Sequence, residues 1–358
     1  MAKRKRRVKK SDAAWKHPRS LAIALFILVG GLFAYFMVTA SAINDCEFVD
    51  NGIDKLTLKN DCTTDMTIHV PDGYTLDGKR HTIRAVDPSG DHFKGAVIAN
   101  SGSEAHVTNL TVEASGLANV CDGGADRLRG IMLEGASGSI THTTVRNINQ
   151  GASGCQEGNA IEVRNEPFDG THPDTQTVEI AHNNIEHYQK TGIVCNGDVN
   201  CNIHNNKVGS AELPNSLAAN SIQLGFGALG SVVQNQIDGN QWCGPSDFVA
   251  TAILLFETGS SDVSKNIIGG NSDVGIYGLT NNTTINNNKV SDDQGIADCN
   301  VNSYDIGIGD YDNYTISPAD DNTVTNNKVS GFDLLYEEVE GGKNKAPGTG
   351  SQKGNPWF

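Results

Sequence analysis

Short runs of alternating apolar and polar residues recur along most of the chain, and each run is too short for a helix but long enough for a strand. In one half of the repeated unit Gly or Ala precedes Ile, as at Gly192-Ile193 and Ala252-Ile253. The other half reads Ile/Val-x-x-Asn-x-Val/Ile. Its Asn stands at Asn183, Asn206, Asn235, Asn266, Asn288 and Asn327. Several of these copies lie roughly 23 to 33 residues apart, a period typical of a solenoid.

The repeated Asn predicts how successive units stack. A single unit cannot bury its apolar side, whereas stacked units bury a continuous column. An Asn at the same turn of every rung can hydrogen-bond to the Asn above and below it, and two earlier copies carry Leu110 and Thr143 at this position. We therefore expect the six asparagines in one corner column. The alternative is a β-sandwich with Asn-rich turns, but a sandwich gives no reason for the motif to recur in register.

The most regular part of the repeat resembles a known group of proteins. It comprises Tyr188-Gln189-Lys190-Thr191-Gly192-Ile193, Asn220-Ser221-Ile222-Gln223 and Gly227-Ala228-Leu229-Gly230. These segments resemble the right-handed parallel β-helix repeat proteins of the pectate-lyase-like superfamily, in its secreted branch, over Met66 to Tyr336. The resemblance implies an all-β fold, a single-stranded right-handed parallel β-helix. It does not specify an activity, because the superfamily holds polysaccharide lyases, glycoside hydrolases, uronan epimerases, tailspikes and non-catalytic surface proteins.

The two ends of the chain differ from the repeats. Residues 1–19 carry nine basic side chains and one acidic side chain, and residues 20–42 carry no charge. An apolar run of this length can span a bilayer, with its basic flank in the cytoplasm; Ala40-Ser41-Ala42 also fits a signal-peptidase site. Residues 20–42 are therefore predicted as a transmembrane anchor or a signal peptide. Outside the membrane we expect an N-terminal cap over 43–65, a β-helix over 66–336 and a flexible tail over 337–358.

The net charge of the chain limits the kinds of molecule that it can bind. The formal net charge is −15, but residues 1–42 hold nine of the 27 basic residues and one of the 42 acidic residues. The remaining chain has 18 basic and 41 acidic residues, a net charge of −23. Such a surface repels nucleic acid, and it would accept an acidic polysaccharide only at a local basic site or through a divalent cation. The acidity is equally consistent with a role in solubility alone. We expect a monomer whose partner is a polysaccharide.

All eight cysteines follow the apolar segment, and an even number in an exported chain predicts disulfides. Cysteines in equivalent loops of nearby rungs should meet, as should two that flank one turn. The four predicted pairs are Cys46–Cys62 in the cap, Cys121–Cys155 and Cys243–Cys299 between equivalent loops, and Cys195–Cys201 around one turn. No Cys-x-x-Cys pair is present, which argues against a zinc site.

The alternation of the first strand in each rung assigns its residues to two faces. The Ile points into the core, so the residue after it points outward. The outward ladder is Met132, Glu134, Glu162, Arg164, Val194, Gln223, Leu254 and Tyr277. Long loops precede this strand on several rungs and should form the wall of a groove along the ladder. In the enzymes that the chain resembles, substrate lies in such a groove.

Polar side chains expected around this groove supply a candidate site. A lyase or epimerase needs a cation to neutralise a uronate carboxylate and a base to take the adjacent proton. The candidate catalytic residues are Lys190, Arg164, Glu162 and Tyr188. The candidate substrate-binding residues are Glu134, Gln223 and Arg129. On the wall, the carboxylates of Asp122 and Asp126 could hold Ca²⁺.

Other interpretations of the ladder stay open. A retaining hydrolase needs two carboxylates about 5–5.5 Å apart, and Glu134 and Glu162 lie on neighbouring rungs, which are spaced by about 4.7–4.9 Å. A Glu/Arg ladder can also be a set of weak surface ion pairs. The paired Asp, Gly-His-Gly and Arg-x-Lys set of polygalacturonases is absent. We therefore expect an exported β-helix, tethered to the membrane, that engages cell-surface or environmental polysaccharide. It acts either as a calcium-assisted lyase or epimerase or as a non-catalytic adhesion module.

Overall fold

The structure is a computed structural model and describes residues 44–151, 154–168, 174–212, 217–244, 248–293, 304–311 and 322–339. These residues belong to one compact unit, Ala42–Phe358. The basic segment 1–19, the anchor or signal peptide expected over 20–42 and most of the expected tail lie outside the described residues. Within the described ranges no helix is long and apolar enough to cross a membrane. The single helical element there is a 3-10 turn, η1 (Gly124–Asp126).

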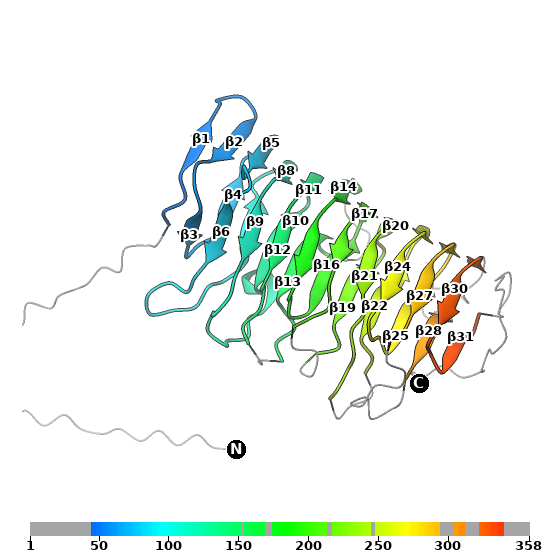
Figure 1. Cartoon of the computed structure of the whole chain (residues 1–358). Coiled ribbons are helices and arrows are strands. Elements are labelled where there is room, and N and C mark those ends of the chain that lie inside the picture. Colours follow the sequence, from blue (N-terminus) through cyan, green and yellow to red (C-terminus); the bar gives the residue numbers. More distant parts are fainter. Residues whose placement is uncertain are drawn as a thin grey trace, which may run out of the picture. The chain divides into compact units, whose positions relative to one another are not determined.

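Three sheets, called A, B and C below, run side by side along the unit (Figure 1). In each complete rung the chain forms a strand of sheet C, then one of sheet B and then one of sheet A. In the described ranges sheet C has ten strands: β4 (Ile68–Val70), β7 (Ala96–Asn100), β10 (Arg129–Glu134), β13 (Asn159–Asn165), β16 (Thr191–Gly197), β19 (Asn220–Gly225), β22 (Thr251–Thr258), β25 (Val274–Thr280), β28 (Ile306–Asp310) and β31 (Leu334–Glu337).

The other two sheets follow the same order along the chain. Sheet B has eleven described strands: β1 (Phe48–Asp50), β2 (Lys55–Leu58), β5 (Tyr74–Asp77), β8 (Glu104–Thr108), β11 (Ser137–Thr141), β14 (Gln176–Ala181), β17 (Val199–His204), β20 (Leu229–Val233), β23 (Ser261–Ser264), β26 (Thr284–Asn286) and β29 (Thr323–Thr325). Sheet A has ten: β3 (Cys62–Thr64), β6 (Thr82–Ala85), β9 (Thr111–Glu113), β12 (Thr144–Arg146), β15 (Asn184–Glu186), β18 (Lys207–Val208), β21 (Gln236–Asp238), β24 (Ile267–Gly269), β27 (Lys289–Ser291) and β30 (Lys328–Ser330).

The repeated Ile forms a buried column inside sheet C, as its position in the motif predicts. The in-register residues are Ile131, Ile161, Ile193, Ile222, Ile253, Ile276 and Ile308, and none has exposed surface. Burying each side chain is worth about 1.5–3 kcal/mol. The small residue before Ile has a steric cause: a Cβ at Gly192 would lie 2.5 Å from the carbonyl oxygen of Ser221 on the next rung.

The six asparagines stack in one buried corner column, as predicted. The backbone N–H and the side-chain Nδ2 of Asn206 both donate to Oδ1 of Asn235, at 2.9 and 3.0 Å. Nδ2 of Asn206 also donates to the carbonyl oxygen of Ile180 at 2.8 Å. The same pair of bonds between successive asparagines recurs from Asn183 to Asn327. The ladder therefore satisfies buried amides that would otherwise destabilise the fold.

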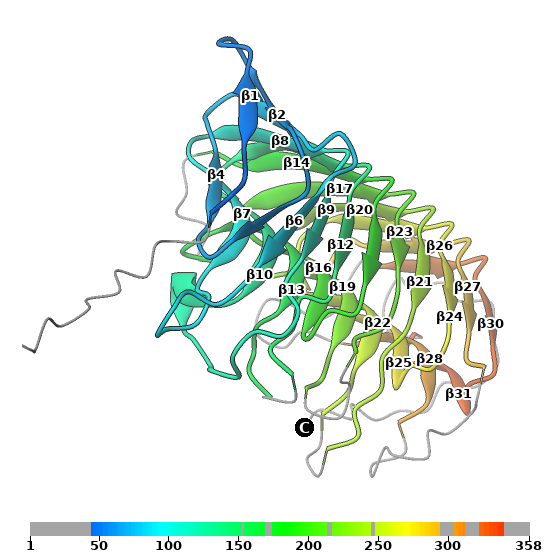
Figure 2. The ribbon, with the colours of Figure 1, turned by 60° about the vertical axis from the view of Figure 1, so that its left-hand side comes forward.

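Three of the four predicted disulfides are confirmed, with Cα–Cα distances of 4.9 Å for Cys46–Cys62, 5.2 Å for Cys121–Cys155 and 6.6 Å for Cys195–Cys201. Cys243 is also disulfide-bonded, and its predicted partner Cys299 lies outside the described residues. The bond between Cys121 and Cys155 ties two neighbouring loops together. Loops of this kind, which lead from sheet A to sheet C, project from one edge of the stack (Figure 2).

The first strands belong to the sheets as well. Strand β1 pairs with β2 antiparallel, whereas β2 and β3 pair in parallel with β5 and β6. Segment 43–65, expected as a cap, therefore already contributes strands to sheets B and A. The β1–β2 hairpin provides the first two strands of sheet B.

Candidate functional site

The outward ladder on sheet C has the predicted register. Met132 pairs with Glu162, Glu162 with Val194, Val194 with Gln223, and the column continues through Leu254 to Tyr277. Its exposure differs from the expectation, because Glu162, Val194 and Tyr277 are 5%, 2% and 5% exposed. Part of this outer face is therefore covered rather than open to solvent.

Arg129 and Glu162 explain the covering at the early rungs. Nε of Arg129 donates to Oε2 of Glu162 at 2.6 Å, and both side chains are buried. The other nitrogens of Arg129 donate to the carbonyl oxygens of Gly124, Ala125 and Arg127. Arg129 thus fastens the 3-10 turn η1 over the sheet. The expectation that Arg129 contacts a substrate is wrong, because its guanidinium is enclosed between Glu162 and the carbonyl oxygens in and next to η1.

Arg164 extends this network across the outer face of β13. Its guanidinium lies 3.0 Å from Glu134 and from Glu166 and 3.7 Å from Glu162. Burial opposes its charge, but the hydrogen bond to Glu134 and the other two carboxylates raise the pKa of Arg164 above its ordinary value. The structure thus brings Arg164, Glu162 and Glu134 together as expected. They form a largely buried ion-pair network, and the expected exposure of Arg164 and Glu162 is wrong.

Tyr188 does not face the groove. Its side chain is completely buried in the core, and its hydroxyl donates to Ser221 Oγ at 3.0 Å and contacts Asn240 Oδ1 at 3.4 Å. Burial, set against these two hydrogen bonds, raises the pKa of the phenol well above its ordinary value. The expectation of a groove-facing Tyr188 is wrong, because the short connection from sheet A to sheet C turns its ring inward.

The two aspartates expected on the groove wall, Asp122 and Asp126, have different surroundings. Oδ2 of Asp122 lies 2.8 Å from Nε2 of His92, whereas Asp126 is exposed within η1. In the described part of the chain neither belongs to a group of three potential metal ligands. The groups found there include Cys46, Cys62, Cys121 and Cys155, whose sulfurs are in disulfides. Calcium binding by Asp122 and Asp126 therefore stays a prediction from the sequence.

Lys190 lies at a pocket on the later rungs of sheet C. The pocket encloses about 180 Å³ and is lined by Lys190, Ala218, Asn220, Val249, Thr251, Leu254, Phe256 and Tyr277. The ammonium of Lys190 donates to the carbonyl oxygen of Ala218, and no described carboxylate lies within ion-pair distance of it. Burial lowers the pKa of Lys190 to about 8. The pocket therefore combines one amine, charged at neutral pH, with apolar and aromatic walls.

Side-chain amides form the polar wall beside this pocket. Thr251 Oγ1 donates to Asn220 Oδ1 at 3.0 Å, and Asn220 Nδ2 donates to Gln223 Oε1 at 3.2 Å. Gln223 Nε2 in turn donates to Asn196 Oδ1 at 3.2 Å. These bonds fix the amides across three neighbouring rungs. Gln223 is bonded to the pocket residue Asn220, and its expected contact with substrate stays a prediction.

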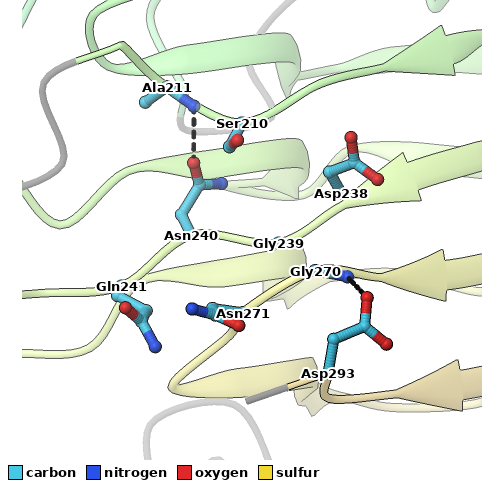
Figure 3. A pocket seen from close by; sticks show the side chains of 9 residues that line it. All are labelled: Ser210, Ala211, Asp238, Gly239, Asn240, Gln241, Gly270, Asn271 and Asp293. Atoms are coloured by element: carbon cyan, nitrogen blue, oxygen red, sulfur yellow. Dashed lines mark hydrogen bonds between the residues drawn. The ribbon is translucent and has the colours of Figure 1, made fainter. Parts of the chain in front are cut away.

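A second hollow lies at the other end of the sheet A-to-C connections. One part, of about 480 Å³, is shown in Figure 3, where Asp238 and Asp293 lie toward one end and the amides of Gln241 and Asn271 toward the other. An adjoining part of about 460 Å³ shares Ser210, Ala211 and Asp238 with it. The lining carboxylates are Glu186, Glu212, Asp238 and Asp293, and the lining ammonium group is Lys207. We call this hollow the acidic depression.

Sequence reasoning placed Lys190, Gln223, Leu254 and Tyr277 at the groove but missed Phe256, Asn220 and Thr251. Phe256 stands two residues after Leu254, so the same alternation along β22 points it outward. Asn220 and Thr251 begin their strands and form an in-register pair. Extending the outward ladder along β22 would have found Phe256. Asn220 and Thr251 stand two residues before the inward Ile222 and Ile253, so alternation alone would not have placed them at the pocket.

Comparison with known proteins agrees with this architecture. Residues 171–340 match the family model described as the right handed beta helix region. The chain folds as a right-handed parallel β-helix. This β-helix matches no curated protein.

Several solved structures are similar to the β-helix. The Dettilon tailspike protein is 13% identical with a TM-score of 0.50, over 83% of this chain and 60% of the tailspike, so the chain spans well under two thirds of the tailspike's length. DFA-IIIase from Arthrobacter chlorophenolicus A6 in complex with GF2 is 12% identical with a TM-score of 0.47, over 81% of this chain and 82% of that chain. At these identities the likeness to the tailspike concerns the fold alone.

Proposed function

We propose that this β-helix is an exported protein that binds a polysaccharide on the outer face of sheet C, with one sugar residue in the Lys190 pocket. The observation that carries the proposal is the pocket itself, where Lys190, the Asn220 amide and the ring of Tyr277 line one small space. Ligand pockets with a few polar groups on apolar walls are the usual form of a binding site. A volume of about 180 Å³ suits a single ring of a longer ligand.

Charge supports this face over the acidic depression. The pocket presents the Lys190 ammonium with no described carboxylate paired to it, whereas four carboxylates line the acidic depression. An anionic polymer would be repelled by the depression and attracted to the pocket. A uronate residue placed beside Lys190 would meet the one cation among the described residues of the pocket. The sugar is therefore inferred to carry a carboxylate.

The ion-pair network bears on whether the bound polymer is cleaved. Both oxygens of Glu162 are engaged, Oε2 by Arg129 and Asn159 and Oε1 by Arg164 at 3.7 Å. This arrangement disfavours a hydrolase that uses Glu134 and Glu162 as acid and nucleophile. A lyase or epimerase is the second candidate, because an amine with a pKa of about 8 can accept a proton near neutral pH. We infer binding without cleavage as the main function and Lys190-assisted elimination as its rival.

The proposal also includes the location of the protein, which we infer from the sequence. The basic segment 1–19 and the apolar segment 20–42 suggest export, with the β-helix held on the outer face of the membrane or released after Ala42. The confirmed disulfides fit an oxidising compartment.

Binding and cleavage can be separated in one screen. Affinity electrophoresis of the protein in polygalacturonate, alginate and neutral dextran should show retardation by a uronic polymer and none by dextran. The same polymers are then followed by the absorbance of unsaturated sugar ends, with and without calcium. Retardation without new absorbance supports a binding protein, and new absorbance supports the lyase. Equal migration in all three polymers would refute the proposed function.

A further inference from the structure

Three phenylalanine rings continue from the pocket across the corner between sheets C and B. Phe256 lines the pocket, and its ring lies 5.3 Å from that of Phe226 at an interplanar angle of 61°. Phe226 stacks on Phe168 at 5.4 Å and 17°. Phe226 is 37% exposed, and the other two rings are partly exposed. We call Phe168, Phe226 and Phe256 the phenylalanine strip.

The backbone at Phe226 is unusual for a residue of this type. Its φ is +55°, and among the non-glycine residues described with positive φ it is the one apolar side chain. Bulky residues in this region are strained, whereas Asn, Asp and Gly tolerate it. The conformation is held by backbone bonds, since Phe226 N–H donates to Phe256 O at 2.9 Å and Gly227 N–H donates to Glu257 O at 2.8 Å. An Asn or Gly would adopt this backbone conformation more readily, so the geometry of the turn does not explain why Phe occupies position 226.

Strand β22 departs from regular geometry at the same corner. Its pairing with β25 shifts register between Phe256 and Thr258, and Glu257 between them has a φ of +53°. Bulges of this kind redirect side chains and are common next to functional sites. Strain of this kind also gathers where function requires a particular geometry. Two local irregularities thus meet where the Phe226 and Phe256 rings are presented.

A glycine on the intervening rung makes room for the third ring. A Cβ at Gly197 would lie 2.7 Å from Cδ1 of Phe168 and 2.4 Å from the carbonyl oxygen of Asn165. The φ of Gly197, +84°, is also one that favours glycine. Phe168 can therefore lie across the corner and reach Phe226 from two rungs away.

Amide groups border the phenylalanine strip. Gly225 has no side chain, and a Cβ there would lie 2.8 Å from Asn196 Oδ1 and 3.3 Å from Gln223 Nε2. The two amides therefore lie over the backbone next to Phe226. A sugar ring has an apolar C–H face and a rim of hydroxyl groups. Flat rings beside fixed amides offer a partner to each part of it, and no member of this set carries a charge.

We propose that the phenylalanine strip is a second subsite, where sugar rings of the same polysaccharide stack after the chain leaves the Lys190 pocket. This inference rests on the proposed function and adds the path of the polymer across the sheet. Phe256 connects the two subsites, because it lines the pocket and touches Phe226. A ligand too short to leave the pocket would not use the strip.

The test compares short and long ligands by calorimetry. Phe226→Asn removes the ring and places a residue that tolerates positive φ. We expect it to weaken binding of galacturonate decamer roughly threefold to tenfold, the range of one aromatic contact, and to leave binding of galacturonate trimer within about twofold. The melting temperature should not fall, as it would if the ring served only packing. Ile267→Asn is the matched control, because Ile267 is 55% exposed on the outer face of sheet A.

The outcomes separate the two proposals. Weaker decamer binding by Phe226→Asn with unchanged trimer binding supports the strip, and Phe168→Ala should act in the same direction. Wild-type affinity for decamer in both variants, or a lowered melting temperature with no specific loss of decamer binding, would overturn it while the pocket stands. Failure of the wild-type protein to bind oligomers of galacturonate and of alginate would instead overturn the proposed function, and the strip with it.

Discussion

Nε of Arg129 lies 2.6 Å from Oε2 of Glu162, and the two side chains are 2% and 6% exposed. The pair joins a strand of one rung to the next and also holds η1 against the sheet through three carbonyl oxygens. Charges buried this deeply are stable only while they remain paired. The pair is therefore structural, although it occupies the face where sequence analysis places substrate.

Arg129→Met should destabilise the protein by about 3–5 kcal/mol, because it leaves Glu162 buried without its main partner. The measurement is the free energy of unfolding in guanidinium chloride. Arg84→Met is the matched control, since Arg84 pairs with Glu113 but its own side chain is 57% exposed; a loss below about 1 kcal/mol is expected there. Equal losses for the two variants would contradict the structural role of Arg129.

Asn235→Ala should cost about 2–4 kcal/mol of unfolding free energy. The change removes the acceptor for both the backbone N–H and Nδ2 of Asn206 and the donor to the carbonyl oxygen of Ile203, all of them buried. Asn202→Ala is the control, because Asn202 is exposed and accepts one bond from Ser231. If the two variants unfold at the same denaturant concentration, the ladder does not stabilise the stack.

Lys190 should make stability rise with pH in the alkaline range. Burial lowers its pKa in the folded state from 10.5 to about 8, so between these values the unfolded chain binds the proton and the folded protein does not. Stability then increases with pH from about 8 to 10.5. Relative to Lys190→Met, the free energy of unfolding should rise by about 1–3 kcal/mol over this pH range. Partial exposure of the side chain to solvent lowers the gain that the full pKa shift would give. A difference between wild type and variant that stays constant over this range would contradict the buried amine.

Loss of the Cys121–Cys155 bond should destabilise the protein by about 2–4 kcal/mol, because the bond closes 34 residues of the unfolded chain. The double variant Cys121→Ser, Cys155→Ser is compared with the wild type in chemical unfolding. Removing Cys46–Cys62, which spans 16 residues, should cost less. A larger effect at Cys46–Cys62 would show that loop closure does not determine the order.

The fold was open to prediction because its signals are periodic. The Gly/Ala-Ile pair fixes which face of sheet C is inside, and the repeated Asn fixes the register of the corner, so sheets, ladder and disulfides follow. The exposure of the outer face of sheet C depends on which loops fold over it. The periodic pattern of the sequence does not predict the course of those loops. Arg164, predicted on the outward ladder, is 4% exposed, and Arg164→Ala should therefore lower the stability of the protein.

The direction of side chains at individual turns was equally unpredictable from the sequence. Tyr188 stands two residues before Lys190, yet its ring lies in the core, where Asn240, 52 residues later in the chain, is a hydrogen-bond partner. Phe226 lies at the corner between β19 and β20, and its contact with Phe168 depends on the space that Gly197 leaves. Such contacts arise from tertiary packing rather than from local spacing.

Hydrogen exchange of the full-length protein with and without galacturonate decamer tests the central claim most directly, because it locates the bound polymer. Binding in the pocket predicts slower exchange in peptides that contain residues 217–220 and 248–251, which border Lys190 and Asn220. Peptides that contain Asp238, Asn271 and Asp293 should exchange at an unchanged rate. Protection confined to these latter peptides would place the polymer in the acidic depression and contradict the assignment of sheet C as the binding face.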